Sequence, residues 1–481
     1  MPPLVLILAL TLLVAIGLLL ILRRTARGNR VGITTSRVGR VVTLVGLSFS
    51  ALRRRIRRLL GRLFLSKAKR EARDREIEAQ AAREIAKAMG DMKGALMKVG
   101  QIVSFMDDAM PEVYRAELAK LQTQAPPMDW EIVEATLRLE LGDDLDRHFS
   151  DIERTPIAAA SIGQVHRAKL RDGTRVAIKV QYPGVDRAIT ADLDNYGMLQ
   201  GMIQAVTPTM DAGPIVDELR ARLSEELDYT KEAENQELFR RLYEGHPNIV
   251  VPRVWKEHSS RRVLTTELIE GARGFYEFSE QASAEEKRTA TLTIHAFAFD
   301  SIYNHYVFNG DPHPGNYLFL EGGRVAFLDF GCVKRFQEQF VEALRALNRL
   351  YLLGEQEAYR EKMVEMRYIL PAGEDKVSVE WLWEYMHFYY LPIMRDEPFL
   401  MTAEHCKKAV GAMFGPAMRK LNMPGEFVLL NRINFGLNSI FARLDACENF
   451  HRISRGYFFK EGDLARYETA QRASAQTAPS R

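Results

Sequence analysis

The hydrophobic pattern changes from strand-like to helical partway along the chain, and this change strongly restricts the fold. Short segments rich in strand formers come first, at residues 152–157, 163–170, 175–180, 249–255 and 262–268. Asp172 and Gly173, between the second and third of these segments, are typical of a hairpin turn. From residue 283 onward apolar residues recur at helical spacing, with a strand-like interruption over residues 317–329. The sequence therefore predicts an α+β fold in which a strand-rich lobe precedes a helical lobe.

A chain of 481 residues is too long for one small core, so further regions are expected around the two lobes. Pro126 and Pro127 mark a break before an amphipathic helix that is predicted to end near Leu141. The predicted regions are an anchor at 1–22, a basic segment at 23–80, a helical extension at 81–145, the strand-rich lobe at 146–270, the helical lobe at 271–465 and a disordered polar tail at 466–481.

The composition is that of an ordinary globular protein, with 47% hydrophobic and 27% charged residues and a net charge of only +3. The three cysteines are far apart in the sequence and odd in number. This argues against a disulfide framework or a zinc cluster, and it suits a reducing compartment.

Residues 4–22 carry no charge, and Thr11 is their only polar side chain. A run of this length, at about 1.5 Å per residue, is long enough to cross a bilayer as a helix. Four arginines follow at once, Arg23, Arg24, Arg27 and Arg30. The positive-inside rule then predicts a single-pass membrane anchor with the rest of the chain in the cytoplasm. A cleaved signal peptide and an organelle-matrix transit peptide are the less favoured alternatives, because the basic residues follow the apolar run and do not precede or interrupt it.

Basic and apolar residues are interleaved in the segment that follows, residues 53–70. This mixture is typical of a helix that lies on anionic headgroups, held by about 1 kcal/mol per basic residue. Membrane lipids are therefore predicted partners. Nucleic acid is the alternative partner for an arginine run, but the preceding apolar run favours lipid, so no nucleic acid is expected.

Residues 309–316 carry the strongest chemical signal in the chain. Four residues separate Asp311 from Asn316, and Asp329 follows one hairpin-sized segment later in an Asp-Phe-Gly motif. Phosphoryl transfer requires a carboxylate near the acceptor oxygen, oxygen ligands for Mg²⁺ and positive charge on the phosphates. The spacing is that of the kinase catalytic loop, so Asp311 is the predicted catalytic base and Asn316 and Asp329 are the predicted metal ligands.

The alternative interpretation of this segment is a proline-rich surface turn followed by an unrelated buried aspartate. Asp-Phe-Gly alone is common by chance, but two motifs in the expected order favour the catalytic interpretation. Pro312 and Pro314 fix two backbone φ angles and should stiffen the loop.

A Val-Ala-Ile-Lys segment that ends at Lys179 matches the strand whose lysine contacts the α and β phosphates of ATP in kinases. Alone it would be a common strand with a solvated lysine, but its position after the hairpin favours the phosphate role. The loop before it has Ala158, Ala159, Ala160 and Ser161 where kinases carry glycines. Glycine lets the backbone approach a nucleotide closely, so three Cβ atoms should alter nucleotide affinity or selectivity.

The alanine-rich loop, a Lys-Val-Gly-Gln motif at residues 98–101 and Glu-Leu-Asp at 226–228, followed by Glu232, together resemble the UbiB family of atypical kinases. The resemblance covers residues 81–335 motif by motif. It implies a protein-kinase-like bilobal fold with an added N-terminal helical extension. It also implies ATP or ADP and Mg²⁺ as cofactors and a role at the membrane in isoprenoid-quinone (ubiquinone-type) biosynthesis or lipid homeostasis. Isoprenoid precursors or the enzymes that process them are the implied partners.

In that family, Lys98 and Gln101 would lie on the added helix, which folds over the place where a peptide substrate would bind. Lys98 would pair with Glu226, and Glu232 would pair with Lys179. Without the resemblance, a lysine and a glutamine three residues apart would usually form a solvated helix face. The resemblance assigns a catalytic role to Asp311, Lys179 and Glu232, a regulatory role to Lys98, Gln101, Glu226 and Asp228, and nucleotide contacts to Ala158, Ala159, Ala160, Ser161, Lys179, Glu267 and Ile269.

Ordinary protein kinases continue from Asp-Phe-Gly into a long segment that ends in Ala-Pro-Glu. Here an amphipathic helical pattern starts at Phe336, soon after Gly331, and no Ala-Pro-Glu follows. A platform for peptide substrates is therefore expected to be absent. The predicted function is an ATP- and magnesium-dependent atypical kinase or ATPase; a small-molecule kinase of the aminoglycoside-phosphotransferase type and a non-catalytic nucleotide-gated scaffold remain alternatives.

Overall fold

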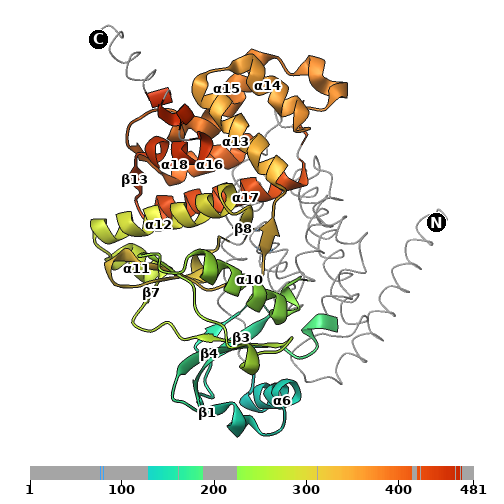
Figure 1. Cartoon of the computed structure of the whole chain (residues 1–481), viewed down its shortest axis with the longest axis vertical. Helices are drawn as coiled ribbons and strands as arrows, with labels where there is room; N and C mark the ends of the chain where they lie inside the picture. Colours follow the sequence, from blue (N-terminus) through green and yellow to red (C-terminus); the bar gives the residue numbers. More distant parts are fainter. Residues whose placement is uncertain are drawn as a thin grey trace, which may run out of the picture. The chain divides into compact units, whose positions relative to one another are not determined.

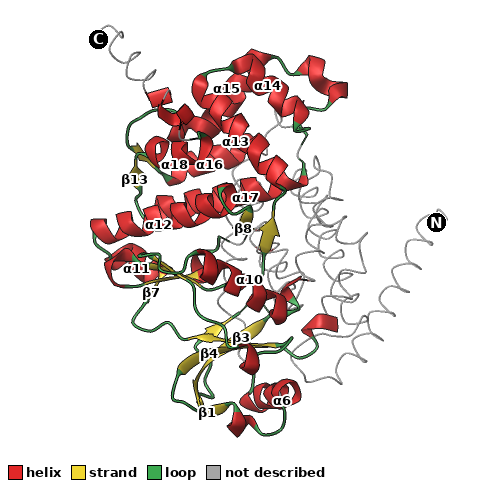
Figure 2. Cartoon of the chain, in the orientation of Figure 1, coloured by secondary structure: helices red, strands yellow, loops and turns green. Residues whose placement is uncertain are grey.

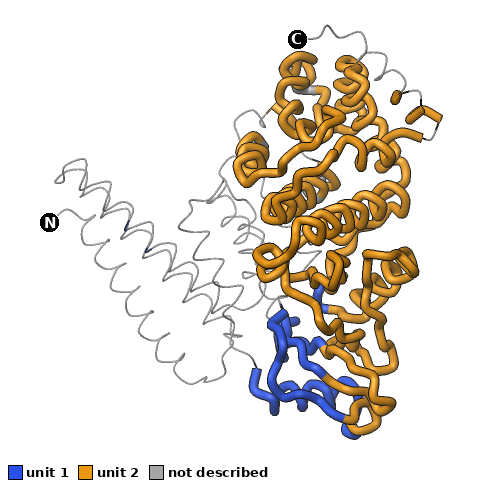
Figure 3. The backbone as a smooth tube through the Cα atoms, turned by 90° about the vertical axis from the view of Figure 1, so that its left-hand side faces the viewer, with its two compact units in different colours: residues 1–145, 151–167, 179–227 blue, residues 146–150, 168–178, 228–481 orange. Residues whose placement is uncertain are grey.

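The structure is a computed structural model of the whole chain (Figures 1 and 2). It describes residues 76, 80, 128–160, 162–187, 225–310, 312–413, 420–422, 424–460, 462–465 and 467–468. The chain divides into two compact units, which Figure 3 colours separately. Unit 1 comprises residues 1–145, 151–167 and 179–227, and unit 2 comprises residues 146–150, 168–178 and 228–481. The boundary between the two units falls inside individual strands. It therefore does not test the two lobes predicted at 146–270 and 271–465, which remain a prediction.

The strands predicted in the first half form one sheet in the order β1-β3-β4-β6, with β2 paired to β3. They are β1 (Phe149–Ile152), β2 (Ala158–Ala159), β3 (Gly163–Leu170), β4 (Arg175–Gln181) and β6 (Val263–Glu267). The predicted turn between β3 and β4 is confirmed, since Thr174 donates its N–H to Oδ1 of Asp172 at 2.8 Å. Gly173 in this turn has a φ of +86°, which glycine adopts without steric cost.

Two predicted strands are shorter than the sequence indicates. Only Ile152, the last residue of β1, is in a strand within the expected range 152–157, and only Ile249–Val250 (β5) is a strand within 249–255. Both lost segments contain a proline, Pro156 and Pro252, which has no N–H to donate to a β-ladder.

In unit 1, helix α6 (Trp130–Leu141) ends as predicted, at Gly142 with a φ of +101°. It buries Val133 and Leu137 completely. The segment that enters this helix is held by Gln164 of β3, whose Oε1 accepts a hydrogen bond from the N–H of Met128 at 2.7 Å.

Unit 2 contains most of the helices and three small sheets. The helices are α10 (Tyr229–Leu242), α11 (Phe275–Gln281), α12 (Ala284–Tyr303), α13 (Glu338–Leu353), α14 (Gln356–Glu365), α15 (Val379–Tyr390), α16 (Ala403–Met413), α17 (Gly425–Arg443) and α18 (Phe450–Phe458). The sheets are β5-β10-β9-β7, β11-β8 and β12-β13, built from β7 (Arg273–Gly274), β8 (Val307–Asn309), β9 (Tyr317–Phe319), β10 (Val325–Phe327), β11 (Val333–Arg335), β12 (Phe399–Leu400) and β13 (Cys447–Glu448). The 3₁₀ turns are η1 (Leu145–Arg147), η2 (Lys256–His258), η3 (Pro314–Asn316), η4 (Glu321–Gly323), η5 (Pro371–Lys376) and η6 (Leu391–Ile393).

Helix α12 crosses the middle of unit 2 (Figure 1), and most residues of its second half are buried. Its start is defined by a capping box, in which Ser283 and Glu286 satisfy each other's backbone N–H groups. It packs against α13, α17 and α18, and the η4 turn packs against its first turns.

The helix predicted to begin at Phe336 begins at Glu338, after Gln337. The residues before it form β11, which pairs antiparallel with β8 so that Val333 lies opposite Asn309. The amphipathic pattern itself is confirmed, since Leu344, Leu347 and Tyr351 recur at helical spacing on α13 and are buried.

The single-pass membrane anchor and the predicted location at a membrane are contradicted. Across the described ranges, no helix is both long and apolar enough to cross a bilayer. The longest of these helices, α12, has 20 residues, but it carries charged residues in its first turns and buries polar residues such as Thr291 and His295 in a protein core. Residues 1–22, to which the anchor was assigned, lie outside the described residues.

Alanine substitutions at Gly322 and Gly323 test how η4 packs on α12. Both have positive φ, +74° and +78°, but an added Cβ would overlap the backbone oxygen of Glu286 only at Gly323. We expect Gly322→Ala to lower the free energy of unfolding by about 1–2 kcal/mol, from backbone strain alone. Gly323→Ala should lower it by about 1–3 kcal/mol more, because the helix backbone resists displacement. Denaturant unfolding measures both, and equal losses would contradict this packing.

Candidate active site

Asn316 and the Asp-Phe-Gly motif are brought together by the β9–β10 hairpin of unit 2. The two strands pair antiparallel, with Tyr317 opposite Phe327. The pairing extends one residue further, because Leu328 donates its N–H to the backbone oxygen of Asn316 at 3.0 Å. Asn316 and Asp329 therefore flank the same end of one hairpin, and both side chains are half-buried. A carboxylate and an amide oxygen at one strand end are suitable ligands for Mg²⁺.

Two hydrogen bonds from described residues help to hold Asp329. Its Oδ1 accepts from the N–H of Gly331 at 3.0 Å, and its backbone oxygen accepts from the side-chain amide of Asn309. Asn309 is only 8% exposed, so this bond is shielded from water. The sequence did not indicate Asn309 as a site residue, although it opens the motif of residues 309–316.

The loop before Asn316 is shaped by His313, for which the sequence indicated no definite role. Its Nδ1 accepts from the N–H of Gly315 at 3.0 Å, and its backbone oxygen accepts from the N–H of Asn316 at 2.9 Å. His313 thus caps the η3 turn that carries Asn316. On its other side the loop contacts α17, since a Cβ added to Gly436 would lie 2.6 Å from Cγ of Pro312.

Helix α10 places Glu232 on the face that contacts the Asp-Phe-Gly motif. Asn235 donates its side-chain N–H to the backbone oxygen of Phe330 at 3.1 Å, and the Phe239 and Phe330 rings lie 5.1 Å apart. Glu232 shares this face at helical spacing. It is 3% exposed, and a carboxylate so buried requires a partner. Its pairing with Lys179 remains a prediction.

A series of packed aromatic rings connects the motif to the core of unit 2. Phe330 is fully buried, and it packs on Phe239, which lies 5.3 Å from Phe297 of α12. Phe297 stacks on Phe327 of β10 at 3.7 Å. The loop that carries Asp329 therefore rests on a rigid apolar base, as a preorganised site requires.

In unit 1, the alanine-rich loop forms a tight β-hairpin. Ala158 lies opposite Val165, and Ala160 donates its N–H to the backbone oxygen of Gly163 at 2.8 Å. Lys179 is half-buried on β4, and the end of this strand lies beside the loop because Tyr182 donates its N–H to Ile162 at 2.8 Å. The loop thus has hairpin geometry without the kinase glycines.

Glu226 and Asp228 occupy different settings. Glu226, in unit 1, is 9% exposed, and its backbone oxygen accepts from the side chain of Gln181 at the end of β4. Asp228, in unit 2, is the N-cap of α10 and accepts from the N–H of Thr230 at 3.0 Å. Capping explains Asp228 without a regulatory role, which remains a prediction for both residues.

Glu267 ends β6, where its carboxylate accepts from the N–H of Arg253 at 3.3 Å, and Ile269 follows half-buried. Their nucleotide contacts remain predictions. Four of the predicted site residues lie outside the described residues: Lys98, Gln101, Ser161 and Asp311.

The comparisons with known proteins agree with this arrangement. Residues 120–363 match the ABC1 atypical kinase-like domain, which is more than half of the chain. The chain belongs to the ABC1 atypical kinase-like family. This confirms the resemblance to UbiB proteins and identifies the chain as a kinase-type protein.

The relatives of this ABC1 protein include a chloroplastic aarF domain-containing protein kinase of Arabidopsis thaliana, 36% identical over 287 residues, and a probable serine/threonine-protein kinase, abkB, of Dictyostelium discoideum, 35% identical over 266 residues. These matches cover 58% and 53% of this chain but only 40% of each relative, so the chain spans about two fifths of their length. A solved Mycobacterium tuberculosis protein, Rv3197 in complex with erythromycin, is similar with a TM-score of 0.60 and 32% identity, over 82% of this chain and 100% of its own. These likenesses support a kinase-like α+β fold.

The ABC1 site fits Mg²⁺ bound together with a nucleotide better than Mg²⁺ bound by protein alone. Within the described part of the chain, no group of three or more His, Cys, Asp or Glu side chains could hold a metal. Mg²⁺ typically takes one or two protein carboxylates and completes its shell with substrate phosphates and water. Asn316 and Asp329 would hold the ion, and the ion would neutralise phosphate charge.

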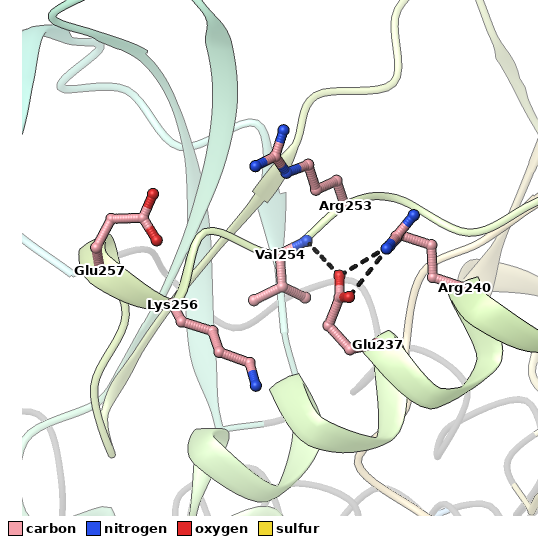
Figure 4. Close-up of a pocket in the computed structure, with 6 residues that line it drawn as sticks. All are labelled: Glu237, Arg240, Arg253, Val254, Lys256 and Glu257. Atoms are coloured by element: carbon pink, nitrogen blue, oxygen red, sulfur yellow. Dashed lines mark hydrogen bonds and ion pairs between the residues drawn. The ribbon is translucent and has the colours of Figure 1, made fainter.

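A polar pocket of about 380 Å³ lies on another face of α10 (Figure 4). Its centre is occupied by the Glu237 carboxylate, which accepts from Nε of Arg240 at 3.0 Å and from the N–H of Val254 at 3.2 Å. Arg253, Lys256 and Glu257 complete the lining. No residue predicted to bind nucleotide lines this pocket, but its Arg253 donates the backbone N–H to Glu267, a predicted nucleotide contact.

Proposed function

We propose that this ABC1 protein binds ATP with Mg²⁺ and transfers or hydrolyses the terminal phosphate. The observation that supports this most is the position of Asn316 and Asp329 at one end of the β9–β10 hairpin. Two oxygen ligands fixed by backbone pairing can grip a metal–phosphate complex with little reorganisation, which is the main requirement of phosphoryl transfer.

The roles of the remaining residues follow from the same chemistry. Lys179 would supply positive charge to the α and β phosphates, with Glu232 as its partner, and Asp311 would accept the proton of the attacking group. The alanine-rich hairpin would cover the phosphates. On the resemblance to UbiB proteins, we propose that the activity supports isoprenoid-quinone biosynthesis, with an isoprenoid precursor or an enzyme that processes it as the acceptor.

The test is phosphate release by the purified full chain with ATP and a Mg²⁺ titration, for wild type and Asp329→Asn. We expect the variant to turn over about 100-fold more slowly, because an oxygen ligand at the transferring phosphate loses its charge. Asp445→Asn is the matched control: Asp445 is exposed, it pairs with Lys287 at 2.9 Å, and its φ of +54° is tolerated by asparagine. The control should keep wild-type turnover.

Equal turnover in wild type and Asp329→Asn would remove Asp329 from the mechanism. Nucleotide binding without turnover in wild type would favour the scaffold alternative over an enzyme. Rapid phosphorylation of an aminoglycoside would favour the small-molecule kinase alternative.

A further inference from the structure

An uncharged cavity of about 200 Å³ lies among the helices of unit 2, away from the β9–β10 hairpin. Most of its lining residues come from α12, α13, α14, α15, α16, α17 and α18, and the lining includes no Asp, Glu, Lys or Arg. The two lining histidines are neutral at physiological pH, since burial lowers the pKa of His405 and lowers that of His295 to about 3. The cavity therefore offers no charge to a ligand.

The lining is largely aromatic and aliphatic. Phe299 and Phe441 are representative of this lining. Ala298, which is 2% exposed, has the smallest side chain among the lining residues that α12 contributes. Phe299 is held in place by the His295 ring, which stacks on it at 4.0 Å. An apolar ligand group would replace water here, and the apolar surface that it buries would stabilise the complex.

Four side-chain amides interrupt this apolar lining, those of Asn348, Asn431, Asn434 and Asn438. Asn434 and Asn438 are four residues apart on α17, so they share one face of the helix. Asn434 is exposed and Asn438 is half-buried, so these two amides lead from solvent into the cavity. Neither of these two amides makes a hydrogen bond to any other described residue. Both a donor and an acceptor are therefore available to a ligand.

We propose that this cavity binds a compact, uncharged, amphipathic molecule: one apolar ring or short apolar chain that carries a single hydrogen-bonding group. A dry cavity of about 150 Å³ is known to accept benzene, so the volume here suits a substituted six-membered ring. The apolar part lies against Phe299 and Ala298, and the polar group meets Asn438. A charged analogue is rejected, because it would lose hydration without gaining a counter-charge.

The proposal is independent of the proposed function, because the cavity and the metal ligands share no residue. The two sites are nevertheless linked through one helix. Gly436 of α17, which lies against Pro312 in the loop before Asn316, stands between Asn434 and Asn438 in sequence.

The probe is para-fluorobenzamide, a single ring with one amide, and its binding to the purified full chain is followed by ligand-observed fluorine NMR. Wild type should bind the probe and should not bind para-fluorobenzoate, which has the same shape but carries a charge. Ala298→Leu, which fills the cavity, should abolish binding. Binding of the benzoate as tightly as the benzamide, or undiminished binding by Ala298→Leu, would overturn the proposal.

Asn438→Leu is the second variant, and it remains informative if Ala298→Leu does not fold. Loss of one hydrogen bond should weaken para-fluorobenzamide binding about tenfold and leave para-fluorotoluene binding unchanged or stronger. If binding of both probes weakened equally, the contact between the polar group and Asn438 would be contradicted.

Thermal unfolding provides the matched control for the cavity itself. Ala290 lies on the same helix as Ala298 and is fully buried, but it does not line the cavity. Ala290→Leu should lower the unfolding midpoint because no space is available, whereas Ala298→Leu should leave it unchanged or raise it. Equal decreases would show that the cavity is filled by the protein and would overturn the proposal.

Discussion

Gly436→Ala is expected to lower ATP turnover about 100-fold while the protein stays folded. The added Cβ would lie 2.6 Å from Cγ of Pro312 and 3.3 Å from the Pro312 backbone oxygen. An ordinary contact is about 3.6 Å, so the loop that precedes Asn316 must move by about 1 Å. The proline ring cannot rotate away, and a misplacement of that size costs about two orders of magnitude in rate.

Stability should not fall in the same way, because alanine is favoured over glycine inside a helix by about 1 kcal/mol. Gly456→Ala in α18 is the matched control: a Cβ there meets nothing within 4 Å, so only the helix propensity changes. Phosphate release and thermal unfolding of the two variants separate the effects. Unchanged turnover in Gly436→Ala would show that α17 does not position the loop.

The second large effect is a loss of stability in acid that comes from His295. Burial lowers the pKa of this histidine in the folded chain to about 3, whereas in the unfolded chain it should be about 6.5. Below pH 6.5 the unfolded chain therefore binds a proton that the folded chain does not bind. The free energy of unfolding should fall by about 1.4 kcal/mol per pH unit between those values, or about 5 kcal/mol in total.

His295→Phe should remove this contribution to the pH dependence of the free energy of unfolding. A phenylalanine ring can keep the stack on Phe299, at the cost of the 3.1 Å hydrogen bond between His295 and Ser454. The variant should thus be about 1 kcal/mol less stable at neutral pH, and its stability should depend less on pH between 6.5 and 4. Replacing the exposed His246 with phenylalanine is the control. Denaturant unfolding at several pH values measures the difference, and parallel curves for wild type and His295→Phe would exclude a buried neutral histidine.

Much of the fold could be predicted because its signals are local. The turn at Asp172 and Gly173, the end of α6 at Gly142 and the buried face of α13 each depend on residues within one turn or one hairpin. The errors were local as well. Pro156 and Pro252 shorten two predicted strands, and the start of α13 was displaced because β11 had no visible signal.

The site was only partly predictable, for a different reason. Asn316 and Asp329 were visible as a spacing in the sequence, and a single hairpin brings them together. Asn235 and Gly436 were not visible, because each acts across about 95 to 124 residues of chain on Phe330 and Pro312. In the sequence alone, an asparagine or a glycine within a helix that contacts a functional loop looks the same as one that does not.

The sequence by itself therefore determined the chemical types at the site, their order along the chain and the family, since these depend on identity and spacing. Only the tertiary structure decided which groups hold Asp329 and the loop at Pro312, and that an uncharged cavity lies beside α12. The reason is that packing joins residues distant in sequence, and the space that they leave or fill depends on the shapes of many side chains together.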